Sequence, residues 1–214
     1  MTRLAFDVVG AEPERYSVVP SLGFRLRIAE TSGQAIQAIA LRCQIMIEPR
    51  KRHYTAHEEG LLAELFGEPA RWGDTLQTLL WANTSMIVPG FTGSTEVDLS
   101  MVCTYDFEVA AAKYLHALGD GDVPLLFLFS GSVFNWTPTG VSIDQIPWHH
   151  EANFGLPVAT WRSAMDRFFP DSAWIRVRRD TFDELIRFRS SLATTSWDDV
   201  VAALLAQARA GERP

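Results

Sequence analysis

Hydrophobic and polar positions alternate along two segments in the first quarter of the chain, residues 24–28 and 39–47. In the longer segment every second side chain is apolar: Ile39, Leu41, Cys43, Ile45 and Ile47. A period of two is typical of a β-strand with one buried face. The pattern predicts a central strand of an antiparallel sheet over residues 39–47, with residues 24–28 as its neighbour.

Further strands are predicted later in the chain. Residues 95–103 repeat the alternation, and residues 123–134 are apolar at both alternations, which indicates burial on both faces. Residues 74–88 are ambiguous in period, but their β-branched residues favour a strand with a bulge at Ala82 and Asn83. Two shorter strands are expected over residues 4–9 and 141–146.

Helices are predicted where the period changes between these strands. Thr55 and Glu58 have the spacing of a capping box, and apolar residues follow at helical spacing as far as Gly67. Residues 106–119 are rich in alanine and indicate a second helix, for which Asp106 is the expected cap. An alternative interpretation continues the preceding strand into this segment.

Beyond Pro147 the pattern becomes mostly helical. One helix is expected to begin at Pro157, and a short strand follows over residues 173–179. Residues 181–184 have the spacing of a second capping box, and Ser196 begins the final helix.

Together these elements predict an α+β protein. We expect an antiparallel β-sandwich with inserted short helices over residues 1–147, and a mostly helical C-terminal part, residues 148–214, packed on the sandwich.

Composition and charge limit the classes of partner. The chain is 47% hydrophobic and 21% charged, which is ordinary for a folded protein. Its formal net charge of -7 argues against nucleic acid or an anionic membrane as a partner. The densest basic cluster, Arg50, Lys51 and Arg52, is interpreted as a solvated turn. No apolar run is long enough for an export signal or a membrane span, so a cytoplasmic location is expected.

Cys43 and Cys103 both occupy inward positions of predicted strands. Their separation resembles that of the bridged pair in immunoglobulin domains, but the accompanying Trp and Tyr are missing. We expect two buried, reduced thiols.

The usual catalytic motifs are missing or incomplete. Residues 88–94 contain the glycines of a phosphate-binding loop without its lysine or its following helix, which favours a tight turn between two strands. Residues 130–132 lack the glycine spacing of a nucleophile elbow. Carboxylates gather at Asp98, Asp106 and Glu108, but the sequence gives no separation between them.

One set of residues is a candidate metal site. His149, His150 and Glu151 are adjacent, and imidazole with carboxylate suits a divalent metal such as zinc or iron. Adjacent histidines on an extended segment point in opposite directions, so only a bend in the chain would bring both to one ligand. His53 and His57 are further candidates, and exposed loop histidines are the alternative interpretation.

Large aromatic rings are concentrated between Phe134 and Trp174. Such rings either attach the C-terminal part to the sandwich or anchor a partner protein. The candidate partner-binding residues are Trp136, Trp148, Phe154 and Trp161.

Three segments carry a resemblance to a known family: MIVPGFTGSTEVDL, CTYDFEVAAAKYLHALGDGDVPLLFLFSG and IPW…EA…LPVATWRSAMD. With them nearly the whole chain resembles a family of uncharacterised bacterial proteins of about this length, a domain of unknown function. Its members tend to be encoded beside nickel-iron hydrogenase structural and maturation genes. The resemblance implies an accessory role and assigns no catalytic residue.

Two functional hypotheses follow. The first is a non-enzymatic protein-interaction or assembly module without a cofactor, which binds a protein partner such as a metalloenzyme subunit. The alternative is a metal-dependent enzyme with a site at His149, His150 and Glu151. We favour the first because no motif with reactive spacing is present. The sequence does not indicate an oligomeric state.

Overall fold

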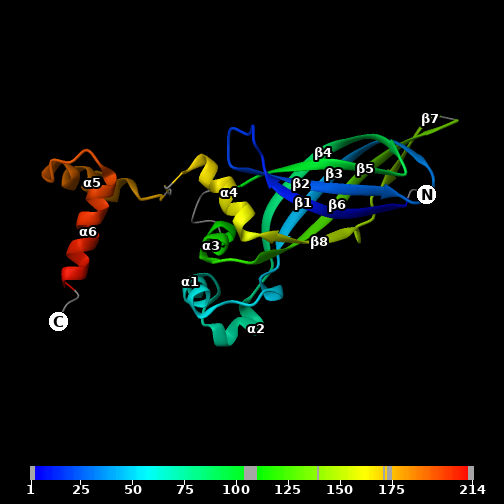
Figure 1. Ribbon diagram of the computed structural model, residues 1–214. Helices are drawn as coiled ribbons and strands as arrows, with labels where there is room; N and C mark the ends of the chain where they lie inside the picture. Colours follow the sequence, from blue (N-terminus) through cyan, green and yellow to red (C-terminus); the bar gives the residue numbers. More distant parts are fainter. Residues whose placement is uncertain (1–2, 104–109, 139, 171, 173–174, 212–214) are drawn as a thin grey trace. The chain divides into compact units, whose positions relative to one another are not determined.

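A computed structural model describes residues 3–103, 110–138, 140–170, 172 and 175–211 of the 214-residue chain. Two antiparallel β-sheets form the larger part of it (Figure 1). The three-stranded sheet has the order β1-β2-β5, and the five-stranded sheet has the order β4-β3-β6-β7, with β8 also paired to β6. The strands are β1 (Leu4–Pro13), β2 (Ser21–Glu30), β3 (Ala35–Ile47), β4 (Leu79–Thr92), β5 (Ser94–Val102), β6 (Asp122–Thr137), β7 (Gly140–Gln145) and β8 (Glu151–Pro157).

The alternating segments line a shared interior between the two sheets, as a sandwich requires. Phe24 of β2 lies edge-to-face with Phe127 of β6, with ring centroids 5.1 Å apart. Phe6 of β1 stacks on Phe129 of β6 at 4.4 Å. The predicted α+β sandwich with inserted helices is therefore confirmed.

The predicted pairing of residues 24–28 with residues 39–47 is wrong. β2 pairs with β1 and β5, whereas β3 pairs with β4 and β6 in the other sheet. The turn between β2 and β3 carries the chain from one sheet to the other. The Glu30 carboxylate stabilises this turn by accepting hydrogen bonds from the Ser32 hydroxyl and from the backbone N–H groups of Arg3, Ser32 and Gln34. Alternation alone identifies a strand, but it does not identify the strand's neighbour.

The strand expectations need two smaller corrections. β6 has one fully buried face, whereas Leu126 and Leu128 on its other face are only half-buried, so it is not buried on both sides. In β4 the register shifts at Trp81, next to the expected bulge at Ala82 and Asn83. The glycine-containing residues 88–94 do join two strands, because β4 ends and β5 begins within them.

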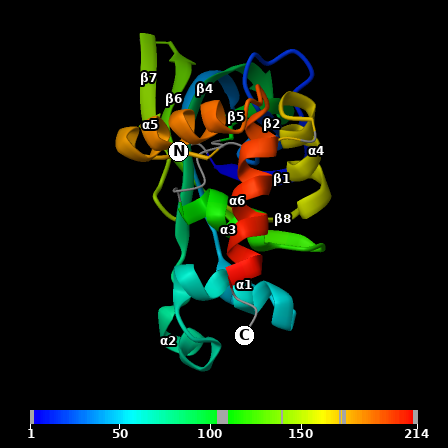
Figure 2. The same ribbon diagram turned by 90° about the vertical axis from the view of Figure 1, so that its left-hand side faces the viewer.

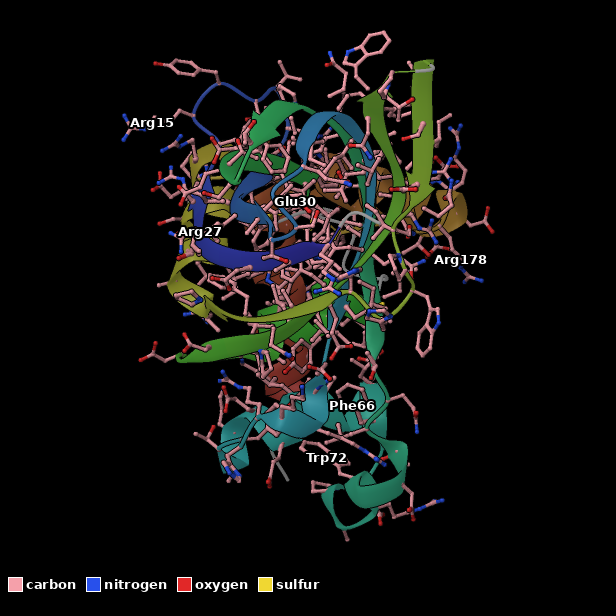
Figure 3. The ribbon with its side chains drawn as sticks, turned by 90° about the vertical axis from the view of Figure 1, so that its right-hand side faces the viewer. Arg15, Arg27, Glu30, Phe66, Trp72 and Arg178 are labelled. Carbon is pink, nitrogen blue, oxygen red and sulfur yellow. The ribbon has the colours of Figure 1, made fainter. Side chains whose placement is uncertain are left out.

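The helices α1 (Ala56–Phe66), α2 (Trp72–Thr75) and α3 (Ala110–Ala117) follow β3 or lie between later strands. The predicted capping box is confirmed: the Thr55 hydroxyl accepts from the Glu58 N–H, and the Glu58 carboxylate accepts from the Thr55 N–H. Gly67 ends α1 at a φ of 77°. Phe66 and Trp72 pack edge-to-face at 6.1 Å in this helical insertion (Figure 3). The expected roles of Asp106 and Glu108 lie outside the described residues.

β8 and α4 (Val158–Phe168) belong to the same compact unit as the sheets. β8 pairs with β6, and Leu156, Val158 and Trp161 are buried in the common core. The observed division of the chain therefore follows Trp174, instead of the expected residue 147. The sequence analysis did not predict β8, because the Asn, Gly and Pro of its sequence EANFGLP disfavour strands.

The second unit, residues 175–214, contains α5 (Arg179–Ser191) and α6 (Trp197–Gly211). Residues 175–178 form no strand, so the short strand expected there is wrong for the described residues. α5 begins at Arg179, before the expected capping box at residues 181–184. Ser196 does cap α6, because its hydroxyl accepts from the Asp199 N–H at 3.2 Å. Across the described residues no helix is both long and apolar enough to span a membrane.

Cys43 and Cys103 are both buried and unpaired, as expected. Burial raises the pKa of each thiol to about 12.

Candidate functional site

The predicted metal-binding residues lie at a turn between β7 and β8. The His150 N–H donates to the Pro147 carbonyl at 3.3 Å, and this bend brings the imidazoles of His149 and His150 to a centroid distance of 4.8 Å. The His150 ring also contacts Phe6 edge-to-face at 5.6 Å. Burial, and then the neighbouring His149, lower the pKa of His150, which favours the neutral imidazole that metals bind.

The described residues supply no third ligand to this pair. Among them, no group of three or more His, Cys, Asp or Glu side chains is arranged to hold a metal ion. Glu151 is exposed at the start of β8, and His53 and His57 are exposed near the start of α1. The metal site remains a prediction, which the structure supports by the proximity of two imidazoles.

The four predicted partner-binding aromatic residues divide into two pairs. Trp161 is 2% exposed, and Phe154 is half-buried against Phe24 at 6.2 Å, so both belong to the core. Trp136 is 67% exposed and Trp148 is 89% exposed. The two interpretations of the aromatic segment each describe part of it, and the second pair is the one that is mostly exposed to solvent.

Trp136 lies on a hairpin that projects beyond the rest of its sheet. The pairing of β3 with β6 ends at Phe134, so the following residues of β6 pair only with β7. Figures 1 and 2 show the β6–β7 hairpin extending past the neighbouring strands. Phe134 is directly opposite Ile143, and Trp136 is directly opposite Val141. Partners in register share one face of a sheet, so these four side chains form a continuous apolar surface, which we call the hairpin face.

The hairpin face is open to solvent. Val141 is 53% exposed and Ile143 is 58% exposed. β7 is also an edge strand, because it pairs with β6 on one side and is the last strand of its sheet. Its sequence GVSIDQ has no proline or lysine, which proteins commonly use to block edge strands. This part of the molecule combines exposed apolar side chains with an edge strand.

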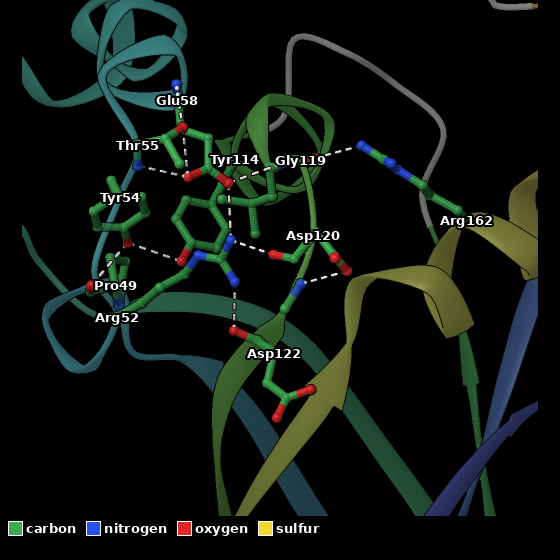
Figure 4. A network of polar contacts seen from close by, with 12 residues as sticks. Pro49, Arg52, Tyr54, Thr55, Glu58, Tyr114, Gly119, Asp120, Asp122 and Arg162 are labelled. Carbon is green, nitrogen blue, oxygen red and sulfur yellow. Dashed lines mark hydrogen bonds and ion pairs between the residues drawn. The ribbon is translucent and has the colours of Figure 1, made fainter.

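A second candidate is a polar network where the helical insertion meets β6 (Figure 4). The Arg52 guanidinium donates to the Glu58 carboxylate at 2.8 Å and to the backbone carbonyls of Asp120 and Asp122. Glu58 also accepts from the Gly119 N–H at 2.8 Å. The side chains of Arg52 and Glu58 are only 10% and 4% exposed.

The network ties elements together and leaves little for a ligand. Glu58 uses both carboxylate oxygens, and only the Nε of Arg52 lacks a partner. Beside it, Tyr54 donates to the Pro49 carbonyl at 2.7 Å and lies 2.9 Å from the Tyr114 hydroxyl. We interpret this cluster as structural.

The interpretation of the basic cluster at residues 50–52 as a solvated turn holds for Arg50 and Lys51, which are exposed in a short turn after β3, but it is wrong for Arg52. Arg50 donates to the Gly73 carbonyl, Lys51 donates to Asn153 at 3.0 Å and pairs with Glu48, and Arg52 is buried in the network. The sequence signals for the network were the capping box and the basic cluster that contains Arg52, whereas the backbone groups at residues 119–122 lie 61 to 70 residues from their partners and gave no signal.

Comparison with known proteins identifies a family whose function is unknown. The sequence profile described as "Family of unknown function (DUF6084)" matches residues 1–213. No curated protein matches the chain.

Among solved structures, a beta-glucosidase from Kluyveromyces marxianus matches 72% of the chain at 6% identity with a TM-score of 0.26. Beta-glucosidase 3B from Thermotoga neapolitana matches 72% at 12% identity with a TM-score of 0.27. The matched regions cover 15% and 17% of those proteins. At these scores the likeness supports no conclusion about fold or activity.

Proposed function

Because the chain belongs to the DUF6084 family, whose function is unknown, we propose a function from its surface. The protein is a non-enzymatic interaction or assembly module that binds a partner protein through the hairpin face. The observation that carries this proposal is the exposure of Trp136, Val141 and Ile143 side by side on a projecting hairpin.

Two physical arguments support it. A cluster of large apolar side chains in water is unfavourable, and such surfaces on folded proteins commonly mark binding sites. As the last strand of its sheet, β7 also presents an edge to which a strand of the partner can add. Tryptophan is among the residues that most often dominate interface energies, which makes Trp136 the expected anchor.

The finer part of the proposal concerns the partner. We place the protein in the cytoplasm as an accessory of a nickel-iron hydrogenase system, with a structural subunit or maturation factor of that system as the protein bound. The hydrogenase role rests on the family resemblance alone.

The test is affinity purification from the native host with two variants. Trp136→Ser with Ile143→Ser removes two anchors from the hairpin face and should lower the recovery of the specific partner at least about tenfold. Val102→Ser is the matched control, because Val102 is an exposed β-branched residue at the end of β5 in the other sheet.

Partner identity separates the two parts of the proposal. A hydrogenase subunit or maturation factor lost only in the double variant supports both parts, whereas an unrelated specific protein supports the binding surface and rejects the hydrogenase role. If the unmodified protein, the double variant and Val102→Ser all recover the partner equally well, the hairpin face is not the binding surface.

The proximity of His149 and His150 favours one second candidate, the metal-dependent enzyme. Protein purified without a histidine tag should then contain near-stoichiometric zinc, iron or nickel that is lost in His150→Ala. Metal-free protein with no gain on reconstitution would reject this candidate.

A further inference from the structure

The outer face of the five-stranded sheet contains a groove that the hairpin face does not include. The groove has a volume of about 820 Å³ and lies over the middle of β3, β4 and β6. Its outward side chains are Arg42, Gln44, Asn83, Ser85, Leu128 and Ser130, and Trp148 lines one wall. No carboxylate lines it, although the chain as a whole has a net charge of -7.

Arg42 differs from the other outward arginines of the central strands. In the three-stranded sheet, Arg25 pairs with Asp98 at 3.5 Å and Arg27 pairs with Glu96 at 2.8 Å, in both cases directly across the strands. Arg42 instead has Ser85 on one side and Ser130 on the other. Its guanidinium makes no hydrogen bond or ion pair with the described residues. An unpaired guanidinium between two small side chains can bind a carboxylate or a phosphate with two parallel hydrogen bonds.

Neutral polar groups continue this arrangement along the sheet. Gln44 is two residues beyond Arg42 on β3 and directly opposite Asn83 on β4. The two side-chain amides, like the hydroxyls of Ser85 and Ser130, are not engaged by other side chains of the described part of the chain. Amides and hydroxyls both donate and accept, which matches the hydroxyl groups of a sugar.

Trp148 adds an apolar ring at the wall of the groove. The Ile146 N–H donates to the Gly131 carbonyl, and the Phe129 N–H donates to the His150 carbonyl, each at 2.9 Å. Between these two bonds the chain leaves the edge of β6, so Trp148 stands out beside Ser130 and remains 89% exposed. The flat face of an indole packs well against the C–H face of a pyranose ring.

We propose that this groove binds a sugar that carries an acidic group, either a carboxylate or a phosphate. Arg42 binds the acidic group, Gln44 and Asn83 bind hydroxyls, and Trp148 packs on the ring. The shallow, open shape allows a sugar within a longer chain or at its end to enter.

Isothermal titration calorimetry with glucuronate and with glucose 6-phosphate tests this proposal on the full chain. At least one of them should bind, and the one that binds identifies the acidic group. Glucose, which has no acidic group, and inorganic phosphate, which has no sugar ring, should each bind at least about tenfold more weakly. Arg42→Gln should lower the affinity at least about tenfold, and Trp148→Ala should lower it several-fold.

Arg25→Gln is the matched control, because Arg25 is an outward strand arginine whose charge is already paired. The Arg25→Gln variant should bind the acidic sugar as tightly as the unmodified protein does. All variants should have the same midpoint of thermal unfolding. The proposal fails if neither acidic sugar binds at millimolar concentration, or if Arg42→Gln and Arg25→Gln bind equally well. Neither outcome affects the hairpin face, which the two titrations do not probe.

Discussion

Gly131 shows how a single residue fixes the contact between two central strands. It has a φ of 138°, and a Cβ atom built there would lie 2.0 Å from the Ala40 carbonyl oxygen. A side chain therefore cannot be accommodated without moving the backbone of β3 away from β6. The glycine of the Ser-Gly-Ser sequence at residues 130–132 is explained by this close approach, which no sequence motif describes.

We expect Gly131→Ala to lower the free energy of unfolding by at least about 3 kcal/mol. Gly33→Ala is the control, because Gly33 also has a positive φ of 81° but no atom within 4 Å of its added Cβ. That control should cost about 1 kcal/mol from backbone strain alone. Urea denaturation measures both, and equal losses would show that the Ala40 contact is unimportant.

At the scale of elements, the Arg52–Glu58 pair joins α1 to the turn that precedes β6. Burial raises the pKa of Glu58, but the hydrogen bonds from the Thr55 and Gly119 N–H groups, and then from Arg52, outweigh it and lower the pKa to about 2. A carboxylate with a lowered pKa in the folded state stabilises the fold above its unfolded pKa of about 4.5, and this contribution disappears as the pH falls towards 2.

We therefore expect stability to fall between pH 4.5 and pH 2, with Glu58 contributing up to about 3 kcal/mol of it. Glu58→Gln should be less stable at pH 7 and should show a shallower fall over that interval. Some slope should remain, since the hydrogen bond from Ser32 and those from backbone N–H groups lower the pKa of Glu30 to about 2 as well. Denaturation at several pH values checks this, and an unchanged slope in Glu58→Gln would contradict it.

Local patterns predicted elements well and their contacts poorly. The Thr55–Glu58 capping box and the strand over residues 95–103 are set by residues close together in the chain, so the local sequence was enough to predict both. The pairing of β3 with β6, and of Arg52 with the backbone at Asp120 and Asp122, depends on residues far apart in the chain. For the same reason, the sequence identified Trp136 and Trp148 as candidates but could not separate them from the buried Trp161.

On the scale of the whole molecule, the core belongs to the first of two compact units. Among the described residues, the cluster of buried hydrophobic residues and the side chains packed on it include none beyond Phe169. Of residues 175–211 in the second unit, only Val200 is buried, and apolar residues such as Leu204 and Leu205 of α6 remain exposed. The stability of the first unit is therefore expected to depend on its own hydrophobic core.

We expect a fragment of residues 1–174 to unfold cooperatively within about 5 °C of the full chain, because no core residue is removed. Circular dichroism melting of both proteins measures this. A fragment of residues 1–147, which lacks β8 and α4, is the informative comparison and should fail to fold. A loss of cooperative unfolding in the longer fragment would contradict the division after Trp174.

Site-specific photo-crosslinking in the native host tests the proposed partner surface most directly. A photoreactive amino acid replaces Val141 or Ile143 on the hairpin face in turn, and Val102 on the other sheet in the control. We predict one discrete crosslinked protein at both hairpin positions and none at the control position. Crosslinks of equal yield at all three positions, or at none of them, would contradict the proposal that the protein binds its partner through the β6–β7 hairpin.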